Sequence, residues 1–129
     1  MKKIKQRSLL LLLISSTVIF SCENQNNFSK IKFINGNYNF GTLSIKDTLT
    51  HTFFLKNISK NKLLIRDAIS SCGCTTIEFS KDAIVKNDSA KITVQFIPDK
   101  LGYSEKTIVV EANTNPPYNI LTLKGDIKE

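Results

Sequence analysis

The chain has 129 residues, of which 41% are hydrophobic and 22% are charged, and its formal net charge is +7. The 14 basic residues that follow position 21 are scattered along the sequence, with Lys60 and Lys62 the nearest approach to a cluster, and no aromatic residues are interleaved with them as a nucleic-acid platform requires. The composition therefore argues against a nucleic-acid partner.

The first 21 residues have the layout of an export signal. A start with four basic residues and no acid precedes an apolar run over residues 9–20, and the small residue Ser21 stands just before Cys22. An apolar run of about a dozen residues is too short to cross a bilayer as a helix. The segment resembles a bacterial lipoprotein signal, which implies that Cys22 becomes the first mature residue and is acylated, as with palmitate.

Lipidation at Cys22 would place the protein outside the cytosol. We expect an exported, membrane-anchored lipoprotein of the bacterial cell envelope, on the outer membrane or the periplasmic face, which meets the membrane through the lipid on Cys22. An ordinary signal peptide with an incidental cysteine, or an uncleaved anchor, is the alternative. Without residues 1–21 the charge falls to +3, because 18 minus 4 leaves 14 basic residues against 11 acidic ones.

The mature chain, residues 22–129, is long enough for one domain with its own core and too short for two. Residues 23–27 are wholly polar and show no periodicity, so they cannot bury enough apolar surface to fold by themselves. We therefore expect residues 22–29 to form a lipidated polar tether and residues 30–129 to form the folded domain.

From Ile31 onward, apolar and polar residues alternate in short runs, which is typical of half-buried β-strands. We expect a strand over about residues 47–56, a turn over residues 57–61, a strand from Leu63, strands closed by turns at residues 98–102 and 113–117, and a last strand that stops at Gly125. About seven short strands in roughly 100 residues predict an all-β, immunoglobulin-like sandwich, with a small closed barrel as the alternative. The inward residues expected on these strands are Leu49, His51, Phe53, Leu55, Leu63, Ile65, Ile92, Val94, Phe96, Ile108, Val110, Leu121 and Leu123.

Residues 71–76, Ser-Cys-Gly-Cys-Thr-Thr, form the one distinctive motif of the domain. In an extended strand the Cα atoms of Cys72 and Cys74 would lie ~6.6 Å apart, at the upper edge of disulfide geometry, and Gly73 allows a bend that shortens this distance. An exported protein meets an oxidising compartment, and with Cys22 acylated two thiols remain, so a disulfide is the economical pairing. We expect strain to make this bond reducible.

Three roles stay open for this cysteine pair: a structural disulfide or inert buried thiols, half of a site for a soft metal such as copper(I), and thiol–disulfide catalysis. A metal site lacks further ligands. His51, the only histidine, would lie ~13 Å along the strand from Cys72 if the strands around residues 57–61 are antiparallel neighbours, and farther away if they belong to opposite sheets. Thiol–disulfide catalysis requires a reactive thiolate, which a nearby cation stabilises. The basic residues nearest to the pair in sequence are Arg66 and Lys81.

Several segments together resemble the bacterial domain of unknown function 1573, over about residues 38–127. The Cys-Gly-Cys-Thr sequence is the most specific of them. The resemblance implies an immunoglobulin-like sandwich of seven or eight strands, of the Hydin and major-sperm-protein kind, used for interaction and without an established activity. The family usually has Pro-Gly before the strand that starts near Ser89, where this chain has Lys-Asn-Asp, so the type of that turn stays open. The other matching segments are Phe40-Gly41, residues 51–57, residues 63–65, residues 92–96, Gly102, residues 106–110, Asn113 and residues 123–125.

Signatures of catalysis are missing from the sequence. It contains no Gly-x-Ser-x-Gly elbow, no phosphate-binding glycine loop and no His-Glu-x-x-His pattern. We predict a non-enzymatic envelope lipoprotein with no catalytic residue, metal or cofactor, whose sandwich binds a protein or glycan partner or serves as a structural module. The alternative is an exported thiol-redox or copper-binding protein that acts through Cys72 and Cys74.

Overall fold

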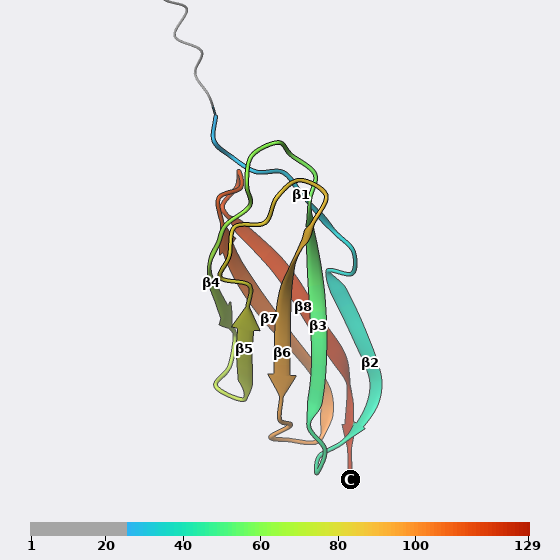
Figure 1. The fold of residues 1–129 in the computed structure, drawn as a ribbon. Coiled ribbons are helices and arrows are strands. Elements are labelled where there is room, and N and C mark those ends of the chain that lie inside the picture. The colour runs from blue at the N-terminus through green and yellow to red at the C-terminus, as the bar shows by residue number, and fades with distance from the viewer. Residues whose placement is uncertain (1–25) are drawn as a thin grey trace, which may run out of the picture.

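The computed structural model of the protein describes residues 26–129 (Figure 1). The predicted signal peptide, the predicted acylation site Cys22 and the first part of the predicted tether lie outside the described residues. Every regular element in the described part is a β-strand. Across residues 26–129 there is no helix with the length and apolar character needed to cross a bilayer. The predicted all-β class is confirmed.

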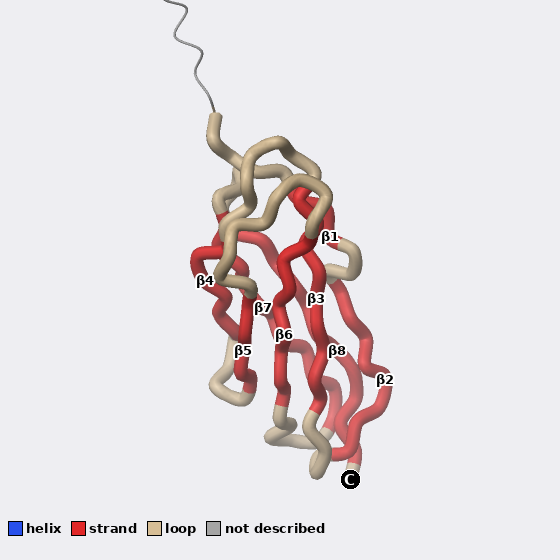
Figure 2. Tube along the Cα trace, in the orientation of Figure 1, coloured by secondary structure: helices blue, strands red, loops and turns tan. Residues whose placement is uncertain are grey.

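Eight strands form two four-stranded sheets that pack face to face, so the sandwich is confirmed in place of the barrel (Figures 1 and 2). One sheet has the order β1-β3-β6-β5 and the other β2-β8-β7-β4. The β2–β8 pair is parallel and all other pairs are antiparallel. The strands are β1 (Ile31–Phe33), β2 (Asn37–Ser44), β3 (Leu49–Asn57), β4 (Ile65–Ser70), β5 (Thr75–Phe79), β6 (Ser89–Phe96), β7 (Gly102–Ala112) and β8 (Tyr118–Lys128).

The core lies between the sheets and is built by the alternating residues that the sequence indicates. Phe53 and Leu55 on β3 and Ile92, Val94 and Phe96 on β6 are at most 1% exposed. The inward residues of β7 and β8 complete the core from the other sheet. Burial of each large aliphatic or aromatic side chain contributes roughly 1.5–3 kcal/mol, so this shared face holds the two sheets together.

Two predicted strand limits are wrong. Leu63 precedes β4 and forms an isolated bridge with Ile84, because the chain must first pass from one sheet to the other. The last strand does not stop at Gly125 but continues to Lys128, since Ile127 is buried and pairs with Gly102.

Gly125 lets β8 continue because it makes room for a neighbouring side chain. A β-bulge at Phe40 shifts the β2–β8 register, and Gly41 beyond it has a φ of +68°. A Cβ atom on Gly125 would lie 2.4 Å from the Phe40 ring and 2.7 Å from the Gly41 carbonyl oxygen, which is too close for any side chain. Two segments that are far apart in sequence, 40–41 and 123–125, therefore form one packing unit.

The turn before β6 has the left-handed backbone that favours glycine. Asn87 has a φ of 73°. Asparagine is among the few other residues that adopt this conformation readily, because its short polar side chain bonds locally. The sequence Lys-Asn-Asp thus forms a turn with a left-handed residue at Asn87 without a glycine.

The loops fall at two ends of the sandwich (Figure 2). We call the end formed by residues 26–30 and loops 58–64, 80–88 and 113–117 the entry end, because the described chain enters the domain there. The disulfide end comprises loops 45–48, 71–74 and 97–101, together with the C-terminus (Figure 1).

A buried amide organises the entry end. Asn57, at the end of β3, is 0% exposed. Its Nδ2 donates to the carbonyl oxygens of Asn61 (2.8 Å) and Ile84 (2.9 Å), and its Oδ1 accepts from the Ser59 backbone N–H (2.9 Å). One side chain therefore fixes the loop after β3 and links it to the loop before β6, as buried amides require full pairing.

The first described residues are bound to this end. Asn61 Nδ2 donates to the carbonyl oxygens of Asn26 (3.0 Å) and Phe28 (2.9 Å). Ser29 is buried, and its backbone N–H donates to the carbonyl oxygen of Asn113 (2.7 Å). Within the predicted tether, residues 26–29 thus follow the surface of the domain through specific hydrogen bonds.

Candidate functional site

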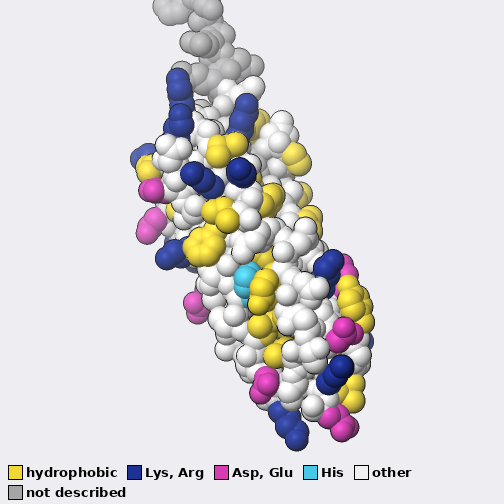
Figure 3. Space-filling view, turned by 90° about the vertical axis from the view of Figure 1, so that its right-hand side faces the viewer, with side chains coloured by type: hydrophobic (Ala, Val, Ile, Leu, Met, Phe, Trp, Pro, Cys, Tyr) yellow, Lys and Arg dark blue, Asp and Glu magenta, His cyan; other side chains and the backbone are white. Residues whose placement is uncertain are grey.

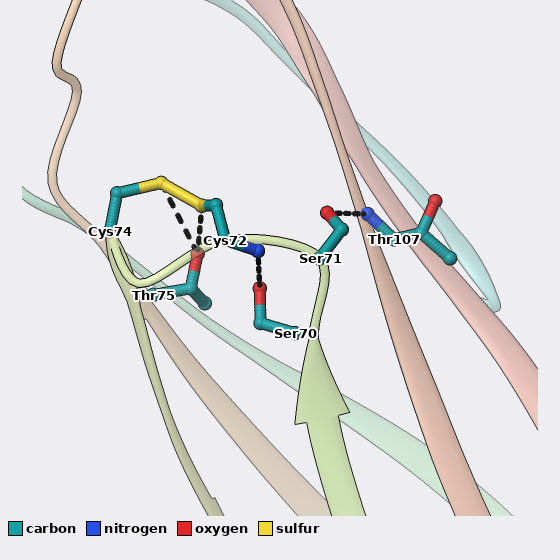
Figure 4. The surroundings of a disulfide bond; sticks show 6 residues. All are labelled: Ser70, Ser71, Cys72, Cys74, Thr75 and Thr107. Atoms are coloured by element: carbon teal, nitrogen blue, oxygen red, sulfur yellow. Dashed lines mark hydrogen bonds between the residues drawn. A yellow bond between two sulfur atoms is a disulfide. The ribbon is translucent and has the colours of Figure 1, made fainter.

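The Cys-Gly-Cys segment connects the two sheets. Residues 71–74 carry the chain from β4, at the edge of one sheet, to β5, at the edge of the other (Figure 4). Ser71 holds the start of this turn to β7, because its N–H donates to the Thr107 carbonyl oxygen (2.9 Å) and its Oγ accepts from the Thr107 N–H (3.2 Å). The Ile97 N–H donates to the Cys74 carbonyl oxygen (3.0 Å) and holds its other side. The turn is therefore anchored to both sheets.

Cys72 and Cys74 are joined by a disulfide within this turn (Figure 4). Their Cα atoms are 5.4 Å apart, closer than an extended strand allows, because the backbone bends at Gly73. Both residues are half-buried, and Cys74 also packs against the core. The sulfur atoms thus lie where the core meets the solvent.

Thr75 places a hydroxyl beside both sulfur atoms. Its Oγ1 is 3.6 Å from Cys72 Sγ and 3.9 Å from Cys74 Sγ (Figure 4). Because disulfide sulfurs carry no proton, the hydroxyl is the donor in these weak contacts. After reduction, the same hydroxyl would be in position to donate to a thiolate, and a hydrogen bond to the charged form lowers a thiol's pKa.

The cations nearest in sequence are engaged elsewhere. Arg66 pairs with Glu111 (3.7 Å), and Lys81 Nζ lies 3.8 Å from the centre of the Phe79 ring. The fold brings a different cation toward the turn. Lys106 precedes Thr107 on β7, and its Nζ lies 5.4 Å from the centre of the Phe96 ring.

Phe96, the aromatic residue that Lys106 contacts, is the cross-strand partner of Thr75, the residue that follows Cys74. Sequence reasoning missed Lys106 because it lies thirty residues after the end of the motif. The available signal was its charge at an inward position of a strand, between Ser104 and Ile108.

His51 lies on the inner face of β3, where its ring stacks on Tyr38 (centroids 3.7 Å apart) and meets Phe53 edge-on. The predicted half-buried position is confirmed. Burial lowers the pKa of His51 from its usual 6.5, since the charged form loses hydration. Its Nε2 is buried without a hydrogen-bond partner.

The fold does not bring His51 to the cysteines. β3 and β4 belong to opposite sheets. His51 shares a sheet with β5, but it pairs with Val94 on β6, and Val94 pairs in turn with Ile77 on β5, three residues beyond Cys74. Within residues 26–129, no group of three or more His, Cys, Asp or Glu side chains is placed to hold a metal ion.

Two four-stranded sheets packed over one core, with the chain crossing between them at β4 and β5, define an immunoglobulin-like β-sandwich. The chain belongs to the family described as "Protein of unknown function (DUF1573)", which it matches over residues 31–127. No curated protein matches the chain by sequence.

Solved structures with the same fold come from distant proteins. A protein of unknown function from Porphyromonas gingivalis W83 is 12% identical with a TM-score of 0.70, over 84% of this chain and 51% of that one, so this chain spans about half its length. PapD-like domain 7 (ASH) of human CEP192 is 14% identical with a TM-score of 0.64, over 80% and 88% of the two chains. WR4, a member of the MSP family from C. elegans, is 11% identical with a TM-score of 0.51, over 78% and 99%. These likenesses establish the fold.

Proposed function

We propose that the protein is a non-enzymatic lipoprotein of the bacterial cell envelope, exported and held on a membrane by acyl chains on Cys22. Its sandwich then serves as an interaction or structural module for a protein or glycan. The observation that carries this proposal is the closeness of the folded domain to the acylation site: Asn26, four residues after Cys22, is already hydrogen-bonded to the sandwich.

An exposed apolar row supports the interaction role. Ile69 on β4, Val109 on β7 and Ile120 on β8 are cross-strand neighbours on the outer face of one sheet. Ile69 and Ile120 are 59% and 53% exposed. Contiguous apolar residues on a sheet surface are suited to contact a partner, whereas single exposed ones need no explanation.

Intact mass measurement tests the anchor. Protein purified from membranes should have lost residues 1–21 and gained the mass of acyl chains on Cys22. A full-length, unmodified polypeptide in the soluble cell interior would overturn the proposal.

Affinity capture from detergent-solubilised membranes tests the interaction role. The Ile69→Ser/Ile120→Ser variant should lose the captured partner. The control variant Val85→Ser/Ile97→Ser, which replaces two exposed apolar residues outside the row, should retain it. Equal recovery with both variants would exclude the row as the contact surface.

The half-exposed disulfide supports a second candidate, thiol–disulfide exchange or copper(I) binding through Cys72 and Cys74. In exchange, the pair takes two electrons and two protons from a partner dithiol, which becomes a disulfide. The Thr75 hydroxyl beside both sulfur atoms would favour the thiolate that attacks in the reverse reaction.

Mass spectrometry after thiol labelling separates this candidate from a structural disulfide. Samples are compared with and without reductant and with copper(I), beside a Cys72→Ser/Cys74→Ser control. Turnover with a dithiol, or retention of copper by the reduced wild type alone, would support the second candidate. A bond that neither exchanges nor yields a copper-binding pair would end it.

A further inference from the structure

Lysines that are scattered in the sequence meet at the entry end. Lys30, Lys60 and Lys86 come from three different segments and line one open groove of about 690 Å³. Its other lining residues are polar or apolar, and none is acidic. In the space-filling view, lysine and arginine side chains gather near the end where the described chain begins, with hydrophobic side chains between them (Figure 3).

The two ends of the sandwich differ in charge. The loops and first residues of the entry end hold five lysines and two acids, Asp82 and Asp88, so 5 minus 2 gives a side-chain charge of +3. The disulfide end, including Lys128 beside the C-terminus, holds three lysines and three acids, so 3 minus 3 gives 0. The excess of positive charge is therefore a property of one end and not of the whole surface. The entry-end lysines are Lys30, Lys60, Lys62, Lys81 and Lys86, and the disulfide end carries Lys46, Lys100, Lys128, Asp47, Asp99 and Glu129.

Exposed apolar side chains stand among these lysines. Phe28 and Ile58 line the same groove and are 50% and 47% exposed. The hydrogen bonds of Asn61 to the carbonyl oxygens of Asn26 and Phe28 hold the segment that carries Phe28 in place. Apolar groups beside basic ones are the combination that binds the boundary between lipid headgroups and acyl chains.

The acylation site confines this end to the bilayer. From Cys22 to Asn26 the backbone spans four residues, so the two Cα atoms are separated by at most ~14 Å. This reach is close to the Debye length of ~8–10 Å at physiological ionic strength, over which anionic lipids attract lysines. A chain anchored at Cys22 therefore holds the entry end within range of the headgroups.

We propose that the entry-end groove is a membrane-docking surface that binds anionic phospholipid headgroups through Lys30, Lys60 and Lys86, with Phe28 and Ile58 inserted beside them. This inference rests on the proposed anchor at Cys22. Docking fixes the orientation of the sandwich on the membrane: its long axis stands away from the bilayer, and the Cys72–Cys74 turn faces the aqueous compartment.

Lysine footprinting of the full, lipidated protein tests the orientation. The protein is reconstituted in phosphatidylcholine vesicles with or without 30 mol% phosphatidylglycerol and treated with an amine-reactive reagent. Labelling of Lys30, Lys60 and Lys86 should fall at least about fivefold on the anionic vesicles, as expected for one lysine near such a surface. Lys46, Lys100 and Lys128 should react equally on both, and 0.5 M NaCl should abolish the difference.

Matched variants identify the surface. In Lys30→Gln/Lys60→Gln/Lys86→Gln, Lys62, one of the two entry-end lysines that remain, should lose its protection on anionic vesicles. The control Lys46→Gln/Lys100→Gln/Lys128→Gln removes the same charge from the other end and should retain it. Equal labelling of lipidated wild type on both kinds of vesicle would overturn the docking surface while leaving the anchor intact.

Failure of the anchor gives a different result. A protein without acyl chains would not float with phosphatidylcholine vesicles. Its flotation with phosphatidylglycerol vesicles at low salt, lost in the entry-end variant, would still support the docking surface. Absence of flotation with both would overturn the surface and the anchor together.

Discussion

The entry end and the disulfide end of the sandwich are stabilised by different chemistry. At the entry end, side-chain amides and hydroxyls of Asn57, Asn61, Asn113 and Ser29 bond to the backbone of neighbouring segments. At the disulfide end, a covalent bond closes the β4–β5 turn, and backbone hydrogen bonds anchor it to β7 and to the residue after β6. The entry end has several long loops to hold, whereas the other end has short turns.

The residues that are easiest to recognise in the sequence are not the ones that we expect to contribute most to stability. A Cys-Gly-Cys motif is easy to find, but a bond between residues two apart restricts little of the unfolded chain. A buried asparagine in a turn-like sequence looks ordinary, yet its removal leaves several buried polar groups without partners. We therefore expect the entry end to contribute more to stability than the disulfide.

Replacement of Asn57 should have the largest effect. Asn57→Ala should lower the free energy of unfolding by about 3 kcal/mol, because it leaves buried donors and acceptors unpaired and opens a cavity. Urea unfolding measures the loss. Asn27→Ala, at an exposed asparagine of the same end, should stay within about 0.5 kcal/mol of wild type. Equal stability of the two variants would contradict the role of Asn57.

Loss of the disulfide should cost less. Cys72→Ser/Cys74→Ser should lower the unfolding free energy by about 1.5 kcal/mol, since the closed loop is so short. Wild type in excess reductant should unfold at the same urea concentration as the variant. If the disulfide variant were less stable than Asn57→Ala, the order of the two ends would be reversed.

The turn at Asn87 tests how much backbone conformation, as distinct from side-chain hydrogen bonds, contributes to the stability of the entry end. Asn87→Ala should cost about 1 kcal/mol, because alanine is strained at a positive φ. Asn87→Gly should remain within about 0.5 kcal/mol of wild type, since glycine accepts this backbone freely. Thermal unfolding of both variants measures the difference, and an equal cost for alanine and glycine would exclude backbone strain as the cause.

His51 lies between the two ends and should give the smallest effect, as a dependence on pH. Its folded pKa is below the ordinary value of 6.5, so the unfolded chain takes up the proton first. Stability should therefore be complete above pH 6.5 and decline as the pH falls from there through the folded pKa. His51→Phe should remove this part of the pH profile of urea unfolding, and an unchanged profile would assign the dependence to other groups.

Much of the fold was predictable because the relevant signals are local. The alternation of Phe53 and Leu55, or of Ile92 and Val94, follows from the two-residue period of a strand packed on one side. The disulfide pairing was favoured by spacing and by Gly73. Gly125 misled the prediction because a glycine at a strand end usually marks a turn, and only the position of the Phe40 ring explains it.

The sequence by itself determined the strand-forming periodicity, the core residues and the cysteine pair, since each depends on neighbours within a few positions. The tertiary structure decided which sheet receives each strand, and with it the environment of His51, the approach of Lys106 to the Cys-Gly-Cys turn and the meeting of Lys30, Lys60 and Lys86 in one groove. These juxtapositions join residues dozens of positions apart, and they exist only after the two sheets pack and the loops at each end come together.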